Sequence, residues 1–151
     1  MMTNAVQTSM REILFRGKRI DNGEWVEGSF LIARDYLTDI LLHIIASNPT
    51  LFPHSEVAGC DNVDPATVGQ YTGRMDRNRK RVFEGDILRM FSIWANGKVE
   101  PVEVPVVVQF SENDQCYVLV TKEGLRYDDF GNYGKPEYYE VIGNIHNNPE
   151  L

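Results

Sequence analysis

The chain has 151 residues, of which 42% are apolar and 25% charged, a composition typical of one globular domain that excludes a disordered protein. Its formal charge is −7, and all of this charge lies in residues 100–151, which hold 3 basic and 10 acidic side chains. This balance excludes a protein that coats duplex DNA over its whole surface, because such binding depends on neutralising phosphates.

The first residues and the two cysteines bear on domain organisation and compartment. Residues 1–9 are polar and lack the apolar segment of a signal peptide, so we expect a disordered leader before a single domain at 10–151. Cys60 and Cys116 are far apart and form no CxxC pair, which indicates a reducing cytoplasm. No run contains the roughly 20 apolar residues of a membrane-spanning helix, so we expect no membrane partner.

The first predicted element is a β-hairpin. Two β-rich runs, 12–20 and 25–31, flank the pair Asn22-Gly23, which is the strongest short hairpin signal. Residues 36–46 follow and are ambiguous, because their apolar positions have helical spacing while the run is short and rich in Ile. Residues 47–63, which include two prolines, predict a long loop.

The remaining segments predict more short strands. Asp64 and Pro65 are typical of the start of a single helical turn. Strands are then expected at 81–93 (entered through a bend at Gly85), 102–110, 116–121 and 138–145. Six to eight short strands with one or two short helical turns predict a mainly β protein, a small antiparallel barrel or roll. The expected core is Ile13, Phe15, Ile87, Val106, Val108, Val118, Val120 and Ile142.

Five blocks of sequence, taken in order, resemble one known family. They are MREILFRGK at 10–18, GEWVEGS at 23–29, DPATVGQYTG at 64–73, DxNxK running into FEGDI at 76–87, and VIGNIHNNPEL at 141–151. Together they are similar to the YopX family of bacteriophage and prophage proteins. The resemblance implies a fold built around an SH3-like barrel, a phage or prophage origin and the cytoplasm of a bacterial host. It implies no known biochemical activity.

Two departures from the family pattern matter. Family members usually have Gly where this chain has Arg79, so either Asn78 alone adopts a positive φ or the turn differs. The segment 36–63 matches weakly, and by its position it looks like a strand followed by a loop. This resemblance favours a strand over a helix at 40–46.

The densest group of basic residues lies at 74–81 and is called the basic tip below. One interpretation is a nucleic-acid or phosphate contact with an aromatic residue as a stacking platform, and the other is a solvated turn. Under the first interpretation the contact residues are Tyr71, Arg74, Arg77, Arg79, Lys80 and Arg81.

Residues 127–140 contain five aromatic and four acidic side chains against one lysine. Such a segment predicts either a surface for a basic protein partner or a loop held on the barrel by its aromatic rings. Under the first interpretation the contact residues are Tyr127, Asp128, Asp129, Phe130, Tyr133 and Tyr138.

No motif indicates catalysis, a metal or a cofactor. The stretch that starts at Asp76 begins like a calcium loop but lacks its glycine and its terminal glutamate, and the histidines lack zinc-site spacing. We therefore expect a non-enzymatic protein with no cofactor and no metal. The leading hypothesis is a module that binds a host or phage protein, and the alternative is a nucleic-acid-binding accessory protein that uses the basic tip. Open strand edges also predict self-association into a homo-oligomer.

Overall fold

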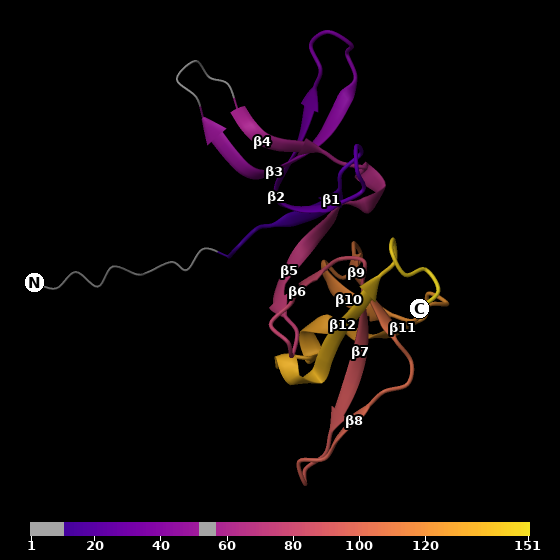
Figure 1. The fold of residues 1–151 in the computed structure, drawn as a ribbon. Helices are drawn as coiled ribbons and strands as arrows, with labels where there is room; N and C mark the ends of the chain where they lie inside the picture. The colour runs from indigo at the N-terminus through magenta and orange to yellow at the C-terminus, as the bar shows by residue number, and fades with distance from the viewer. Residues whose placement is uncertain (1–10, 52–56) are drawn as a thin grey trace, which may run out of the picture.

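The computed structural model describes residues 11–51 and 57–151 and is mainly β, with antiparallel strand pairs (Figure 1). Helical structure in these residues is limited to three 3-10 turns. The predicted fold class is thus confirmed. The expected strand number was too low, because the described residues form twelve strands. The predicted leader at 1–9 lies outside the described residues.

The first sheet has the strand order β4-β3-β2-β1-β5-β6. Its strands are β1 (Phe15–Lys18), β2 (Trp25–Arg34), β3 (Leu41–Leu51), β4 (Val57–Asn62), β5 (Gly69–Met75) and β6 (Arg81–Phe83). The predicted hairpin is confirmed, since Lys18 pairs with Trp25 and Gly23 has φ +71° in the turn. A short turn, η1 (Pro65–Thr67), follows β4, and the Asp64 carboxylate accepts the Ala66 N–H there at 3.0 Å.

Residues 41–46 of the ambiguous segment belong to strand β3, as the family resemblance favoured, while residues 36–40 form the turn that precedes it. The helical spacing of its apolar residues is overridden because the first half of β3 pairs with β2, from Leu41 opposite Arg34 to Ala46 opposite Ser29. The predicted loop at 47–63 is wrong for the described part of this segment, and its residues 52–56 lie outside the described residues. β3 continues to Leu51, and β4 pairs with it as an edge strand.

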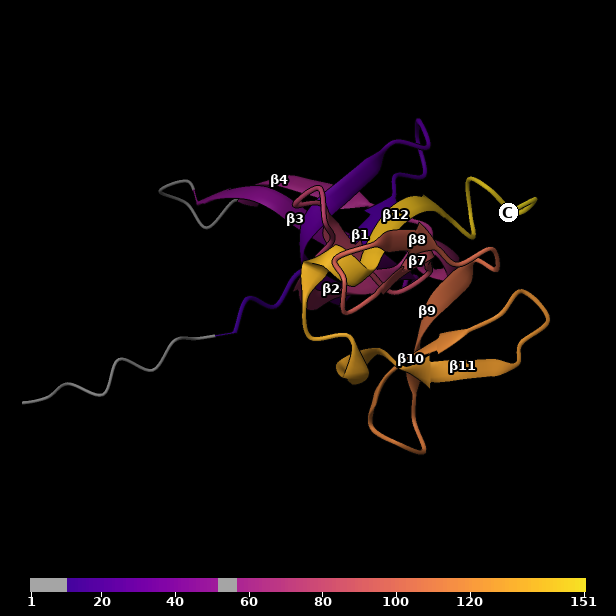
Figure 2. The same cartoon turned by 90° about the horizontal axis from the view of Figure 1, so that it is seen from below.

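The second sheet has the order β11-β10-β9-β7-β12, with β8 paired to β7 (Figure 2). Its strands are β7 (Asp86–Ile93), β8 (Val99–Pro101), β9 (Val106–Ser111), β10 (Cys116–Val120), β11 (Arg126–Asp129) and β12 (Tyr139–Asn144). The turns η2 (Phe130–Asn132) and η3 (Pro136–Tyr138) link its last two strands. The β7–β8 hairpin projects at the opposite end of the molecule from the β2–β3 hairpin (Figure 1).

The main core lies inside the second sheet. Five of the eight expected core residues are buried, two are half-buried (Phe15 and Ile142), and Ile13 is 65% exposed because it precedes the first strand. The buried cluster consists of Val82, Leu88, Met90, Val106, Val108, Leu119, Phe130 and Tyr139.

A buried ion pair joins the two sheets. Arg16 on β1 and Asp86 on β7 approach to 2.6 Å, and both side chains are at least nine-tenths buried. The Arg16 guanidinium also lies 4.8 Å from the ring centres of both Trp25 and Phe83. The bend before β7 lies at Gly85, whose φ of +85° is a conformation that favours glycine, as the sequence predicted.

The turn between β5 and β6 shows how the chain forms this turn with Arg79 at the position where family members usually have glycine. Arg79 itself adopts φ +63°, so neither expected solution holds. The turn is kept because the Asp76 carboxylate accepts the N–H groups of both Asn78 and Lys80.

Replacing Arg79 with Gly is expected to raise the free energy of unfolding by about 0.5–1 kcal/mol, because a left-handed conformation costs a residue with a Cβ about 1–2 kcal/mol and the greater freedom of unfolded glycine offsets part of this. Urea unfolding measures the change. Arg77 is the control, since it lies in the same turn without a positive φ, and Arg77→Gly should lower stability. Equal effects of the two substitutions would contradict the explanation.

Candidate functional site

A cavity of about 370 Å³ lies between the β7–β8 hairpin and the segment that carries β11, η2 and η3. We call it the aromatic groove. Met90, Ser92 and Val102 line part of it. Most of the other lining side chains are aromatic: the set is Phe91, Ile93, Trp94, Tyr127, Tyr133 and Tyr138.

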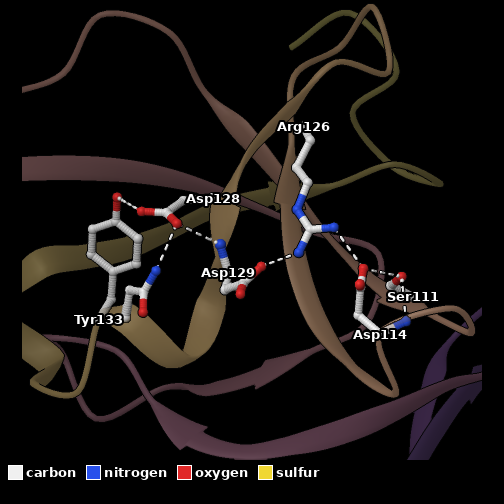
Figure 3. A network of polar contacts seen from close by, with 7 residues as sticks. Ser111, Asp114, Arg126, Asp128, Asp129 and Tyr133 are labelled. Carbon is white, nitrogen blue, oxygen red and sulfur yellow. Dashed lines mark hydrogen bonds and ion pairs between the residues drawn. The ribbon is translucent and has the colours of Figure 1, made fainter.

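Hydrogen bonds hold the tyrosine side of the groove in place (Figure 3). The Tyr133 hydroxyl donates to the Asp128 carboxylate at 3.1 Å, and the same carboxylate accepts from the Asn132 amide at 2.7 Å. Burial, and then the neighbouring Tyr127 and Asp128, raise the pKa of Tyr133. The bond from Asn132 lowers the pKa of Asp128. Tyr133 is therefore a neutral donor and Asp128 an ionised acceptor at neutral pH.

Arg126 on β11 forms ion pairs with two acidic side chains of this part of the second sheet. Its guanidinium contacts both Asp129 and Asp114, the latter at 2.6 Å (Figure 3). Ser111 donates a further hydrogen bond to Asp114 at 2.7 Å. Asp128 has no ion-pair partner among the described residues. A negative charge is thus left beside the groove.

The basic tip lies against the acidic and aromatic segment of the same chain. The Arg74 guanidinium donates to the Tyr133 carbonyl at 2.7 Å and lies 5.1 Å from the Phe130 ring centre. Arg77 stacks on Phe91 at 4.0 Å. The two regions that carry opposite charge in the sequence therefore meet within one subunit.

The six residues proposed for a nucleic-acid contact have different environments. Tyr71 is 4% exposed and packs on Phe83, so its ring is not a surface platform. Arg81 pairs with Glu12 and Glu27, and Arg74 is held as described above. Arg77, Arg79 and Lys80 are exposed.

Most of the residues proposed for a protein contact lie together at the aromatic groove. Tyr127, Tyr133 and Tyr138 all line the aromatic groove, with Asp128 holding one of them. Phe130 does not belong to this surface, because it is 1% exposed and packs in the core against Tyr139.

The sequence analysis missed the opposite wall of the groove. Phe91, Ile93 and Trp94 lie on or just after β7, and they face the tyrosines because β8 turns back beside that strand. The signal available was the turn at Asn96-Gly97, where Gly97 has φ +83°, since an Asn-Gly pair after an apolar run indicates a hairpin.

His146 lies at the junction of the sheets, with its ring 5.9 Å from that of Trp25. Burial, and then the positive charges of Arg16 and Lys18, lower the pKa of His146. The unfolded chain therefore binds a proton more readily at this residue, and stability should fall as the pH is lowered through about 6.5.

Thermal unfolding between pH 8 and pH 5 tests this expectation. His146→Gln should flatten the pH dependence in this range, because it removes the group that the fold keeps neutral. A slope unchanged by His146→Gln would contradict the assignment.

In the ranges 11–51 and 57–151, no three His, Cys, Asp or Glu side chains gather as they would around a metal ion. Nor does that part of the chain contain a helix with the length and apolar character needed to span a bilayer.

One comparison with known proteins shows the family, and another shows the fold. A family model described as YopX protein matches residues 14–151. A solved structure, titled "Crystal structure of protein EF1440 from Enterococcus faecalis", is similar with a TM-score of 0.53 and 22% identity, covering 94% of this chain and 99% of that one. At that identity the likeness concerns the fold alone. No curated protein matches the chain.

Proposed function

The chain belongs to the YopX family, and from that premise we propose that it is a non-enzymatic module that binds another protein through the aromatic groove. The observation that carries the proposal is the convergence of Tyr127, Tyr133 and Tyr138 with Phe91 and Trp94 on one cavity. Trp and Tyr are enriched among the few interface residues that contribute most of the binding energy in protein complexes.

The charge near the groove indicates the kind of partner: Arg77 stacks on Phe91 of one wall, but acidic side chains prevail in the segment that carries the tyrosines. Residues 100–151 carry a net charge of −7, and Asp128 lies beside the groove with no ion-pair partner in the described part of the chain. Acidic surfaces favour basic partners. We therefore propose an extended segment of a partner protein, with apolar side chains in the groove and Lys or Arg beside them.

The family resemblance adds context to this proposal. It implies that the gene is of phage or prophage origin and that the protein acts in the cytoplasm of a bacterial host. The partner would then be a host or phage protein.

Selection of a displayed random-peptide library on the full chain tests the proposal. Peptides enriched in basic and apolar residues are expected, and Tyr127→Ala should weaken the best of them at least about tenfold, because it truncates an aromatic anchor. Tyr36→Ala is the control, since Tyr36 is 96% exposed on the β2–β3 hairpin, away from the groove. No enrichment, or equal losses in the two variants, would reject the proposal.

Nucleic-acid binding at the basic tip is the second candidate. Its support is the exposure of Arg77, Arg79 and Lys80 on one turn. Binding of this kind would weaken steeply with salt and would decrease when Arg77 and Arg79 become Ala. Binding that does not depend on salt, or no binding at all, would reject this second candidate function.

Self-association stays a prediction. The free end of the β2–β3 hairpin exposes a group of large apolar side chains, and sedimentation velocity would measure whether they associate. They are Leu31, Ile32, Tyr36, Leu37, Ile40 and Leu41.

A further inference from the structure

A second cavity, of about 380 Å³, lies between β5 and β10, and it shares no lining residue with the aromatic groove. Arg11 and Arg74 line it, and no carboxylate does. This lining is unusual in a chain with 22 acidic and 15 basic side chains. Two arginines without a carboxylate form a site that attracts an anion.

The two arginines have unused hydrogen-bonding capacity. Arg74 is half-buried and bonds to the Tyr133 carbonyl and to the Tyr139 hydroxyl, which leaves part of the five N–H donors of its guanidinium for a ligand. Arg11 is exposed and makes no ion pair with any described residue. A phosphate suits them, because its oxygens accept several guanidinium N–H groups at once.

The rest of the cavity suits a planar ring. Phe110 and Tyr117 form an edge-to-face pair with ring centres 5.4 Å apart, and Phe110 is 41% exposed. Gln70 and Gln115 also line the cavity. Side-chain amides both donate and accept hydrogen bonds, as the edges of nucleobases require.

We propose that this cavity binds a nucleotide, with its phosphate at Arg11 and Arg74 and its base against Phe110. The volume is in the range of small-ligand sites. The proposal is independent of the aromatic groove, since neither site supplies a residue to the other's lining.

Calorimetric titration of the full chain tests the proposal with four ribonucleoside 5′-monophosphates, the matching nucleosides and inorganic phosphate. At least one nucleotide is expected to bind more tightly than phosphate and than its own nucleoside. Arg11→Gln should weaken that nucleotide about tenfold or more. Phe110→Ala should weaken the nucleotide and leave the affinity for phosphate unchanged.

Arg34→Gln is the matched control, because it removes the same charge from an exposed arginine on β2 that lines neither cavity. It should leave nucleotide binding unchanged. The proposal is overturned if no nucleotide binds, if phosphate binds as tightly as every nucleotide, or if the two arginine variants lose equal affinity.

A short single-stranded RNA distinguishes the two sources of a nucleotide. Tighter binding of the RNA than of the monophosphate, lost in Arg11→Gln, would identify a strand as the source and support the proposal. Equal binding, also lost in Arg11→Gln, would identify a free nucleotide and support it too. Binding of the monophosphate that does not depend on Arg11 would overturn it.

Discussion

Replacing Asp76 with Ala is expected to unfold most of the protein at room temperature. The side chain is 1% exposed, and its carboxylate accepts N–H groups from Asn78, Lys80 and Val141 at 2.8, 2.9 and 2.9 Å. A hydrogen bond to a charged group contributes about 1.5–3 kcal/mol. The loss of three such bonds, about 5 kcal/mol or more, approaches the whole stability of many domains. Circular dichroism during urea unfolding measures the loss.

Two further variants make this result specific. Asp76→Asn keeps the shape of the side chain, but only its oxygen can accept hydrogen bonds. We therefore expect it to lower the free energy of unfolding, but by less than Asp76→Ala does. Asp64→Ala removes a carboxylate from an exposed turn where it caps Ala66, and it should cost about 1 kcal/mol. If Asp76→Ala and Asp64→Ala lower the free energy of unfolding equally, the hydrogen bonds that link the β5–β6 turn to β12 do not stabilise the protein.

Replacing Arg16 with Met is expected to lower the free energy of unfolding by about 3–5 kcal/mol, because it leaves the buried Asp86 carboxylate without its partner. Asp86 also accepts the Phe83 N–H at 2.8 Å, so the carboxylate is held in place rather than free to reach water. Denaturant unfolding measures the loss.

The double variant Arg16→Met with Asp86→Asn separates charge from packing. It removes the unpaired charge, while the amide introduced in place of the carboxylate keeps an oxygen for the Phe83 N–H, so it should be more stable than Arg16→Met alone. A double variant as unstable as the single one would mean that Arg16 acts through its packing on Trp25 and Phe83 and not through its charge.

The sequence predicted those parts of the fold that local chemistry determines. The Asn22-Gly23 hairpin, the turn at Asp64 and the bend at Gly85 all require particular residues, and each is found where it was expected. The strand β4 was missed because it is an edge strand with little apolar alternation, and its existence depends on pairing with β3. Only the pairing of distant residues identifies such a strand.

The site was predictable in part. Tyrosines and acids gathered within residues 127–140 indicated one wall of the groove, but the other wall comes from β7, far earlier in the chain. Nor could the sequence show that Arg74 and Arg77 of the basic tip would lie on Tyr133 and Phe91. These contacts depend on how the turn between β5 and β6 packs on the second sheet.

The central claim, that a partner segment binds in the aromatic groove, is tested most directly by the fluorescence of Trp94, which lines the groove and is 56% exposed. In a Trp25→Phe variant, Trp94 is the only remaining tryptophan. Titration with the tightest selected peptide should shift its emission to shorter wavelength in a saturable manner. The shift should disappear in Tyr127→Ala and persist in Tyr36→Ala. Binding of that peptide with no change in Trp94 emission, or with the same change in Tyr127→Ala, would contradict the claim.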